Sequence, residues 1–168
     1  MATTGGILSA SLWNSTVYNG LNFLLSPVAF KGYSTVSQNL ASSTTSTVLN
    51  LDTELIDTDG AHSTTTNTSR FTCQTAGWYY ITGSVCFATN SSGTRTLNIF
   101  LNGAGVVGAA NQVAPSASNG TSVLSSTFVQ LNVGDYVELA AWQNSGSSLG
   151  TSTSTAIATT MCVYRVSN

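Results

Sequence analysis

Residues 71–87 read FTCQTAGWYYITGSVCF, and residues 131–139 read LNVGDYVEL. The first stretch contains a short apolar run, a turn signal at Ala76-Gly77 and a long run in which apolar residues alternate with polar ones. The second stretch places a tight turn at Gly134-Asp135 directly before another apolar run. Strands joined by tight turns are therefore the dominant pattern of the chain.

The same pattern covers the rest of the chain after Pro27. Strands are predicted at 28–36, 47–51, 70–73, 78–87, 94–101, 122–131, 136–142 and 156–166. The stretches 41–47, 62–69 and 145–155 are rich in Ser and Thr and are predicted to be loops. Many short strands without a long helical segment predict one all-β domain over residues 28–168, an antiparallel jelly-roll sandwich.

Residues 1–27 have a different pattern and are predicted to form an N-terminal arm with a short amphipathic helix. Its apolar residues recur at i, i+4, i+8 and i+11, namely at Trp13, Val17, Leu21 and Leu24. Ser9 or Ser11 can cap the helix, and Pro27 ends it. Because so short a helix is marginal alone in water, it must dock on something. It either packs on its own body or serves as an attachment arm that inserts into a partner or a neighbouring subunit.

The composition excludes several classes of protein. Only 6% of the 168 residues are charged, whereas an average soluble domain has roughly 25%. Hydrophobic residues make up 42%, which is enough to build a core and excludes charge-driven disorder. Four basic residues and a net charge of −2 cannot neutralise a run of phosphates, so we expect no nucleic-acid partner.

The sequence also gives no indication of a membrane span or of a signal peptide. No window approaches the 18 or so continuous apolar residues of a membrane span. Residues 1–6 read MATTGG, without the basic and apolar regions of a signal peptide, so we expect synthesis in a cytoplasm. The three cysteines, Cys73, Cys86 and Cys162, are widely spaced and are expected to be small strand residues rather than a disulfide framework.

Catalytic chemistry is not indicated. His62 is the only histidine, so a histidine metal cluster is impossible and any Ser-His-Asp triad would have to use this residue in a turn context. Asp57 and Asp59 could offer oxygen ligands to calcium, but their spacing does not match an EF-hand loop. The alternative is a solvated loop that carries most of the chain's few charges. We predict no enzyme, no cofactor and no established metal site.

The aromatic residues of the strands have two interpretations. On strands, aromatic side chains are more often core or subunit-interface residues than a stacking platform for sugars. The candidates are Trp78, Tyr79, Tyr80, Tyr136 and Trp142.

These residues carry a resemblance to a known family. The body resembles the tumour necrosis factor / complement C1q-like jelly roll in the residues at 51–54 with Asp57, 70–73, 77–80, 101–103 and 131–139. The resemblance implies a homotrimer in which three jelly rolls pack around an apolar axis. Two features depart from the family pattern: residues 160–166 lack its usual aromatic-Gly-apolar run, and no collagen-like stalk is present.

The arm carries a second resemblance. Residues 6–14, which read GILSASLWN, are followed by Val17 and by Asn22-Phe23-Leu24, and they are similar to the N-termini of many tailed-bacteriophage virion proteins. The resemblance implies a virion component made in the host cytoplasm.

Two functions follow as hypotheses. The first is a non-enzymatic capsid decoration, or cement, trimer whose arm binds the major capsid protein or another virion scaffold protein. The alternative is the receptor-binding tip of a tail or head fibre, whose polar loops recognise a glycan or protein of the host surface. A secreted lectin-like ligand is disfavoured by the missing signal peptide.

Overall fold

The computed structural model describes residues 9–167, so residues 1–8 of the predicted arm lie outside the described residues. The helical segments are α1 (Ala10–Leu12), the π-helix η1 (Trp13–Tyr18) and α2 (Asn19–Leu25). The strands are β1 (Ala29–Tyr33), β2 (Asn39–Leu40), β3 (Ser43–Val48), β4 (Thr53–Asp57), β5 (Arg70–Thr72), β6 (Gly77–Phe87), β7 (Arg95–Leu101), β8 (Ala104–Val113), β9 (Thr121–Leu131), β10 (Tyr136–Gln143), β11 (Leu149–Gly150) and β12 (Thr160–Ser167).

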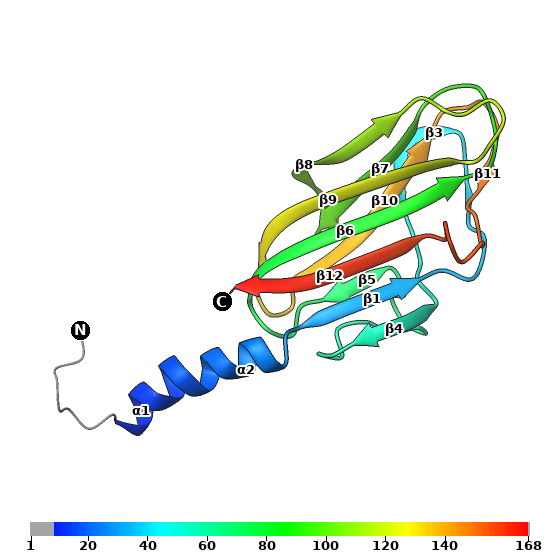
Figure 1. Cartoon of the computed structure of the whole chain (residues 1–168). Coiled ribbons are helices and arrows are strands. Elements are labelled where there is room, and N and C mark those ends of the chain that lie inside the picture. The colour runs from blue at the N-terminus through cyan, green and yellow to red at the C-terminus, as the bar shows by residue number, and fades with distance from the viewer. Residues whose placement is uncertain (1–8, 168) are drawn as a thin grey trace.

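Most of the strands form two facing antiparallel sheets, as the jelly-roll prediction requires, and β2 pairs with β11 in a separate two-stranded sheet (Figure 1). One sheet has five strands in the order β4-β1-β12-β6-β9, and the other has four in the order β5-β10-β7-β8. Strands far apart in the sequence are neighbours, since β1 pairs with β12 and β5 pairs with β10. The prediction of an all-β jelly roll preceded by a short helix is confirmed.

The core lies between the two sheets. In β6, Tyr79, Ile81 and Val85 are buried, while their neighbours Trp78 and Tyr80 point away from the core. This alternation is the period of an extended strand with one buried face, and it matches the sequence pattern. The facing sheet contributes residues such as Leu97, Ile99, Val137 and Leu139.

Several elements differ from the sequence prediction. Strand β8 was not expected, because its sequence AGVVGAANQV alternates poorly and is rich in small residues. It forms because β7 supplies backbone partners for Ala104–Gly105 and for Ala110–Val113, on either side of a register shift. Strand β3 occupies Ser43–Val48, where a loop is predicted at 41–47, and residues 49–51 leave the strand although Leu49 and Leu51 are buried.

Two further boundaries are corrected by the structure. The acidic stretch predicted as a solvated loop contains β4, which pairs with β1 at the edge of the five-stranded sheet. The last strand begins at Thr160 rather than at residue 156, because residues 155–157 form a turn.

The arm is one continuous helical rod that extends from the base of the sandwich (Figure 1). Ser9 caps it, with its Oγ accepting a hydrogen bond from the Leu12 N–H at 3.1 Å. The helix ends where the N–H of Ser26 donates to the Asn22 carbonyl, directly before Pro27.

Candidate functional site

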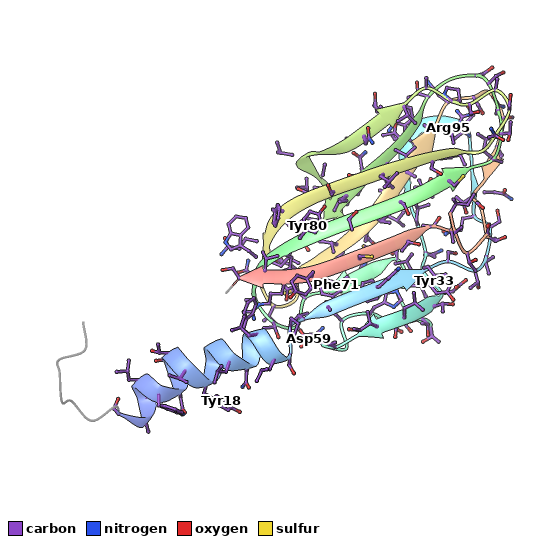
Figure 2. All side chains as sticks on the ribbon, in the orientation of Figure 1. Tyr18, Tyr33, Asp59, Phe71, Tyr80 and Arg95 are labelled. Carbon is purple, nitrogen blue, oxygen red and sulfur yellow. The ribbon has the colours of Figure 1, made fainter. Side chains whose placement is uncertain are left out.

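An aromatic row crosses the outer surface of the five-stranded sheet. Tyr164 in β12 is paired in register with Tyr80 in β6, and Tyr80 is paired with Phe128 in β9. The rings of Tyr80 and Phe128 lie 4.9 Å apart between centroids, at a 45° tilt. All three side chains are exposed, and Phe128 retains 60% of its accessible surface. Figure 2 shows Tyr80 on the side of β6 that faces away from the second sheet.

The row belongs to a larger apolar surface. Trp78 and Leu124 point outward from the same strands, one on each side of the row along the strand direction. We call the set of Trp78, Tyr80, Leu124, Phe128 and Tyr164 the aromatic face.

The aromatic face is almost free of charge. In the described parts of β1, β6, β9 and β12, Lys31 is the single charged residue that points outward from the strands. Large apolar side chains exposed together on a sheet normally mark a surface that another molecule covers.

The five aromatics singled out from the sequence have different places. Tyr79 is fully buried in the core, and burial raises the pKa of its phenol. Trp78 and Tyr80 lie on the aromatic face, whereas Tyr136 and Trp142 are half-buried on the four-stranded sheet. Tyr136 is covered by the Arg70 guanidinium, 3.9 Å from its ring centroid, and therefore packs within its own chain.

Three residues of the aromatic face were not singled out by sequence reasoning: Leu124, Phe128 and Tyr164. A signal for them exists in the alternation of the strands. Side chains alternate between the two faces of a strand. Leu124 and Phe128 lie an odd number of residues from the buried Val123 and Leu131, so they point away from the core.

The arm is a second exposed apolar surface. Trp13, Leu21 and Leu24 of the predicted stripe are exposed, with Leu24 at 72%, and Val17 is half-buried. Leu12, Tyr18 and Leu25 enlarge the exposed area. Within the arm, residues Trp13–Tyr18 form a π-helical segment, which holds more residues per turn than an α-helix.

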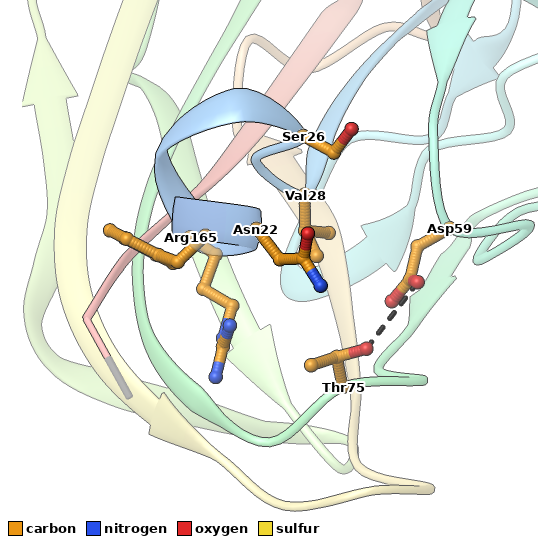
Figure 3. A pocket seen from close by; sticks show the side chains of 7 residues that line it. Asn22, Ser26, Val28, Asp59, Thr75 and Arg165 are labelled. Atoms are coloured by element: carbon orange, nitrogen blue, oxygen red, sulfur yellow. Dashed lines mark hydrogen bonds between the residues drawn. The ribbon is translucent and has the colours of Figure 1, made fainter. Parts of the chain in front are cut away.

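The root of the arm touches the body at one well-defined place. The Arg165 guanidinium lies 5.5 Å from the Phe23 ring and donates two hydrogen bonds to the Ala76 carbonyl, at 3.0 and 2.7 Å. An open cavity of about 680 Å³ separates α2 from the base of the sandwich (Figure 3). The helix is thus fixed at its C-terminal end, while its apolar stripe is left uncovered.

The acidic residues near His62 are used within the chain. The two carboxylate oxygens of Asp57 accept hydrogen bonds from the N–H groups of Asp59 and His62, at 3.3 and 2.9 Å. Asp59 accepts from the Thr75 hydroxyl at 3.4 Å (Figure 3). In residues 9–167 no three Asp, Glu, His or Cys side chains gather as a metal site would require. The calcium candidates Asp57 and Asp59 remain a prediction.

His62 has the geometry of a structural bridge. Its buried ring places Nδ1 2.7 Å from a Glu54 carboxylate oxygen and Nε2 3.0 Å from the Thr68 carbonyl. The ring also packs against Phe30, with centroids 5.0 Å apart. Both nitrogens therefore face acceptors in the chain, and the imidazole connects β4 to the loop that follows it.

The thiols have the environment of packed side chains. Cys73 and Cys86 are buried and Cys162 is half-buried. Burial raises the pKa of Cys73 and of Cys162, which lowers the fraction of reactive thiolate. None of the helices in the described part of the chain is long and apolar enough to cross a membrane.

Comparison with known proteins identifies the class of the fold. The model of the C1q domain family matches residues 29–158, and the chain belongs to this family. The globular domain of zebrafish complement 1qA is similar in structure, with a TM-score of 0.60 and 14% identity over 84% of this chain and 99% of that one. Murine APRIL at pH 8.5 gives a TM-score of 0.62 and 10% identity over 83% of this chain and 99% of that one. No curated protein matches the sequence.

Domains of the C1q and tumour necrosis factor type commonly form trimers. Membership of this family is consistent with a homotrimer.

Proposed function

We propose that the protein is a non-enzymatic virion structural protein, a homotrimer that decorates a phage capsid and stabilises it. The observation that carries the proposal is the presence of two separate exposed apolar surfaces, the aromatic face and the arm. The first is suited to self-association and the second to attachment, so one chain carries both contacts that a decoration protein needs.

The aromatic face supports the homotrimer on energetic grounds. Aromatic side chains bury large areas on association. At about 25 cal/mol per Å², covering on the order of 200 Å² of this face in each copy contributes about 5 kcal/mol before the cost of association. Around a three-fold axis the same face of each copy meets its two neighbours, which closes the assembly at a fixed size.

The arm supports attachment to a scaffold. A single helix with the exposed side chains of Trp13, Leu21 and Leu24 offers a modest apolar contact. A trimer presents three such arms, and linked binding events add up to an avidity well above the affinity of one arm. The proposed scaffold is the major capsid protein or another virion protein.

The assignment to a phage virion rests on the sequence. Residues 6–14 resemble the N-termini of tailed-bacteriophage virion proteins, although residues 6–8 lie outside the described residues. A chain with only 6% charged residues also suits a site on a large particle, where apolar contacts hold it in place.

A receptor-binding fibre tip is the second candidate function. One observation favours it: the polar loops at 88–94, 114–120 and 144–148 gather at the end of the sandwich opposite the arm (Figure 1). If the arm is held by a virion, these loops point outward, where they could contact a glycan or protein of the host surface.

Copy number separates the two functions. We would quantify the protein in purified particles by mass spectrometry against the major capsid protein. Hundreds of copies in a fixed ratio to the shell are expected for the decoration protein. A handful of copies would instead support the fibre tip, and absence from particles would contradict both.

A further inference from the structure

Strand β8 carries a large bulge at its outer edge. Asn98 in β7 pairs with Ala110, but Phe100 pairs with Gly105, so residues 106–109 all lie opposite Ile99 alone. Gly108 permits the bulge with a φ of +75°. Within it Ala109 is buried, whereas Val107 is 97% exposed. The bulge therefore presents an isolated apolar side chain, the Val107 knob, to the outside.

Hydrogen bonds between the two sheets show where the Val107 knob lies along the strand direction, which we call its level. The Ser125 hydroxyl donates to the Ala109 carbonyl at 2.5 Å, and the Asn111 amide donates to the Leu124 carbonyl at 2.7 Å. Because β8 and β9 run in opposite directions and residues 106–109 bulge out of the ladder next to the bonded Ala109, we place Val107 close to the level of Ser125 and Ser126. The registers then connect Ser126 through Thr82 and Cys162 to Lys31.

A cavity lies at that same level on the opposite edge of the molecule. It measures about 250 Å³ and is lined by Lys31, Tyr33, Leu55, Thr155 and Thr160. Leu55 comes from β4 and Lys31 from β1, the two strands at the far end of the five-stranded sheet from β9. Leu55 is 63% exposed although it is a large aliphatic residue. The cavity thus joins apolar and polar walls and is large enough for an isopropyl group.

Strand β8 is an edge strand and therefore also exposes backbone groups that lack a partner strand. Residues 104–113 contain no charged residue and no proline, which are two of the usual protections of an exposed edge, and the bulge interrupts this edge only at residues 106–109. The unpaired carbonyls of β8 are acceptors, and the Lys31 ammonium at the rim of the cavity is a donor that can meet them. One edge therefore offers a projecting apolar side chain and backbone acceptors, and the other offers a cavity and an ammonium donor.

We propose that Val107 of one copy inserts into the Lys31–Leu55 cavity of the next copy. A projection and its receptor on opposite edges at one level form a head-to-tail contact, which closes when the rotation between copies generates a ring. This inference rests on the proposed homotrimer and adds to it: the aromatic face supplies apolar area, while the knob fixes the rotation between neighbouring copies.

Cross-linking tests the contact directly. The full chain would carry Val107→Cys and Leu55→Cys, with Cys162→Ser to remove the half-buried native thiol, and would be treated with a short bismaleimide. Covalent dimers and trimers on a denaturing gel are expected, because the two positions lie on opposite edges of one chain and can be linked only between copies. The matched controls are the two single cysteine variants in the Cys162→Ser background, which should give no such ladder.

Sedimentation of the same samples separates the possible failures. A trimer that does not cross-link above the single variants would overturn the knob contact and leave the proposed homotrimer intact. A monomer would overturn the homotrimer itself and the knob contact with it.

Discussion

Gly77 shows how a single missing side chain shapes the base of the sandwich. A Cβ built at this position would collide with the Ser167 carbonyl and with Nε of Arg165. We expect Gly77→Val to lower the free energy of unfolding by more than about 1 kcal/mol, since overpacking forces backbone shifts. The control is Gly105→Val in β8, where a Cβ meets only ordinary contacts with Phe100. Equal urea midpoints for the two variants would contradict this account.

Two carboxylates make stability depend on acid pH. Burial alone would raise the pKa of Asp52, but hydrogen bonds from the Thr35 N–H and from the Thr53 and Thr35 hydroxyls outweigh it and lower the pKa below the ordinary 3.8. The side chain of Asn102 and the N–H of Asn132 lower the pKa of Asp135 in the same way.

The sign of the pH dependence follows from these lowered values. A carboxylate with a depressed folded-state pKa stabilises the fold above its unfolded value and loses this contribution as the pH falls through the folded value. We expect urea midpoints to be flat from pH 7 to about 5 and to fall below pH 3.8. Asp52→Asn should flatten that fall, and an unchanged profile in this variant would refute the assignment.

Among the elements, the arm gives the clearest functional prediction. Trp13 and Leu21 are both about half exposed, so replacing them removes little packing from the body. We expect Trp13→Ala with Leu21→Ala to leave a folded trimer and to abolish docking, measured by co-sedimentation with particles that lack the protein. The control replaces two exposed polar residues of the arm, Asn14→Ala with Thr16→Ala. Docking that survives in the apolar double variant would rule out the arm as the attachment element.

The elements also show where sequence reasoning succeeds. Strands β6, β7, β9 and β10 were predicted within a residue or so, because large apolar residues alternate along them and Gly-containing turns bound them. The helix was predicted from the spacing of its apolar residues and from a cap at Ser9 or Ser11, and in the structure Ser9 is the cap.

Other elements depend on tertiary partners and leave little local signal. Strand β8 has mostly small residues and takes its conformation from β7, and β4 carries charges typical of a loop but pairs with β1. The aromatic face was predicted only in part. Trp78 and Tyr80 lie in a conspicuous aromatic run, whereas Phe128 and Tyr164 join them only through the register of the folded sheet.

At the scale of the whole molecule, association should depend on the aromatic face. In a trimer Phe128 would lie against neighbouring copies, so Phe128→Glu would bury three carboxylates near one axis, at high desolvation cost. We expect this variant to be a folded monomer by sedimentation and circular dichroism. Val133→Glu is the control, because Val133 is similarly exposed but lies in the turn between β9 and β10. If the Phe128→Glu variant associates as the wild type does, the aromatic face is not part of the interface.

Sedimentation equilibrium of the wild-type protein at micromolar concentration decides whether three copies of the chain associate, as the proposed interface on the aromatic face requires. The proposed homotrimer predicts a single species of about three times the 17.3 kDa chain mass. A species of one chain mass at every concentration would contradict it, because the exposed row of Tyr80, Phe128 and Tyr164 would then have no partner among copies of the chain.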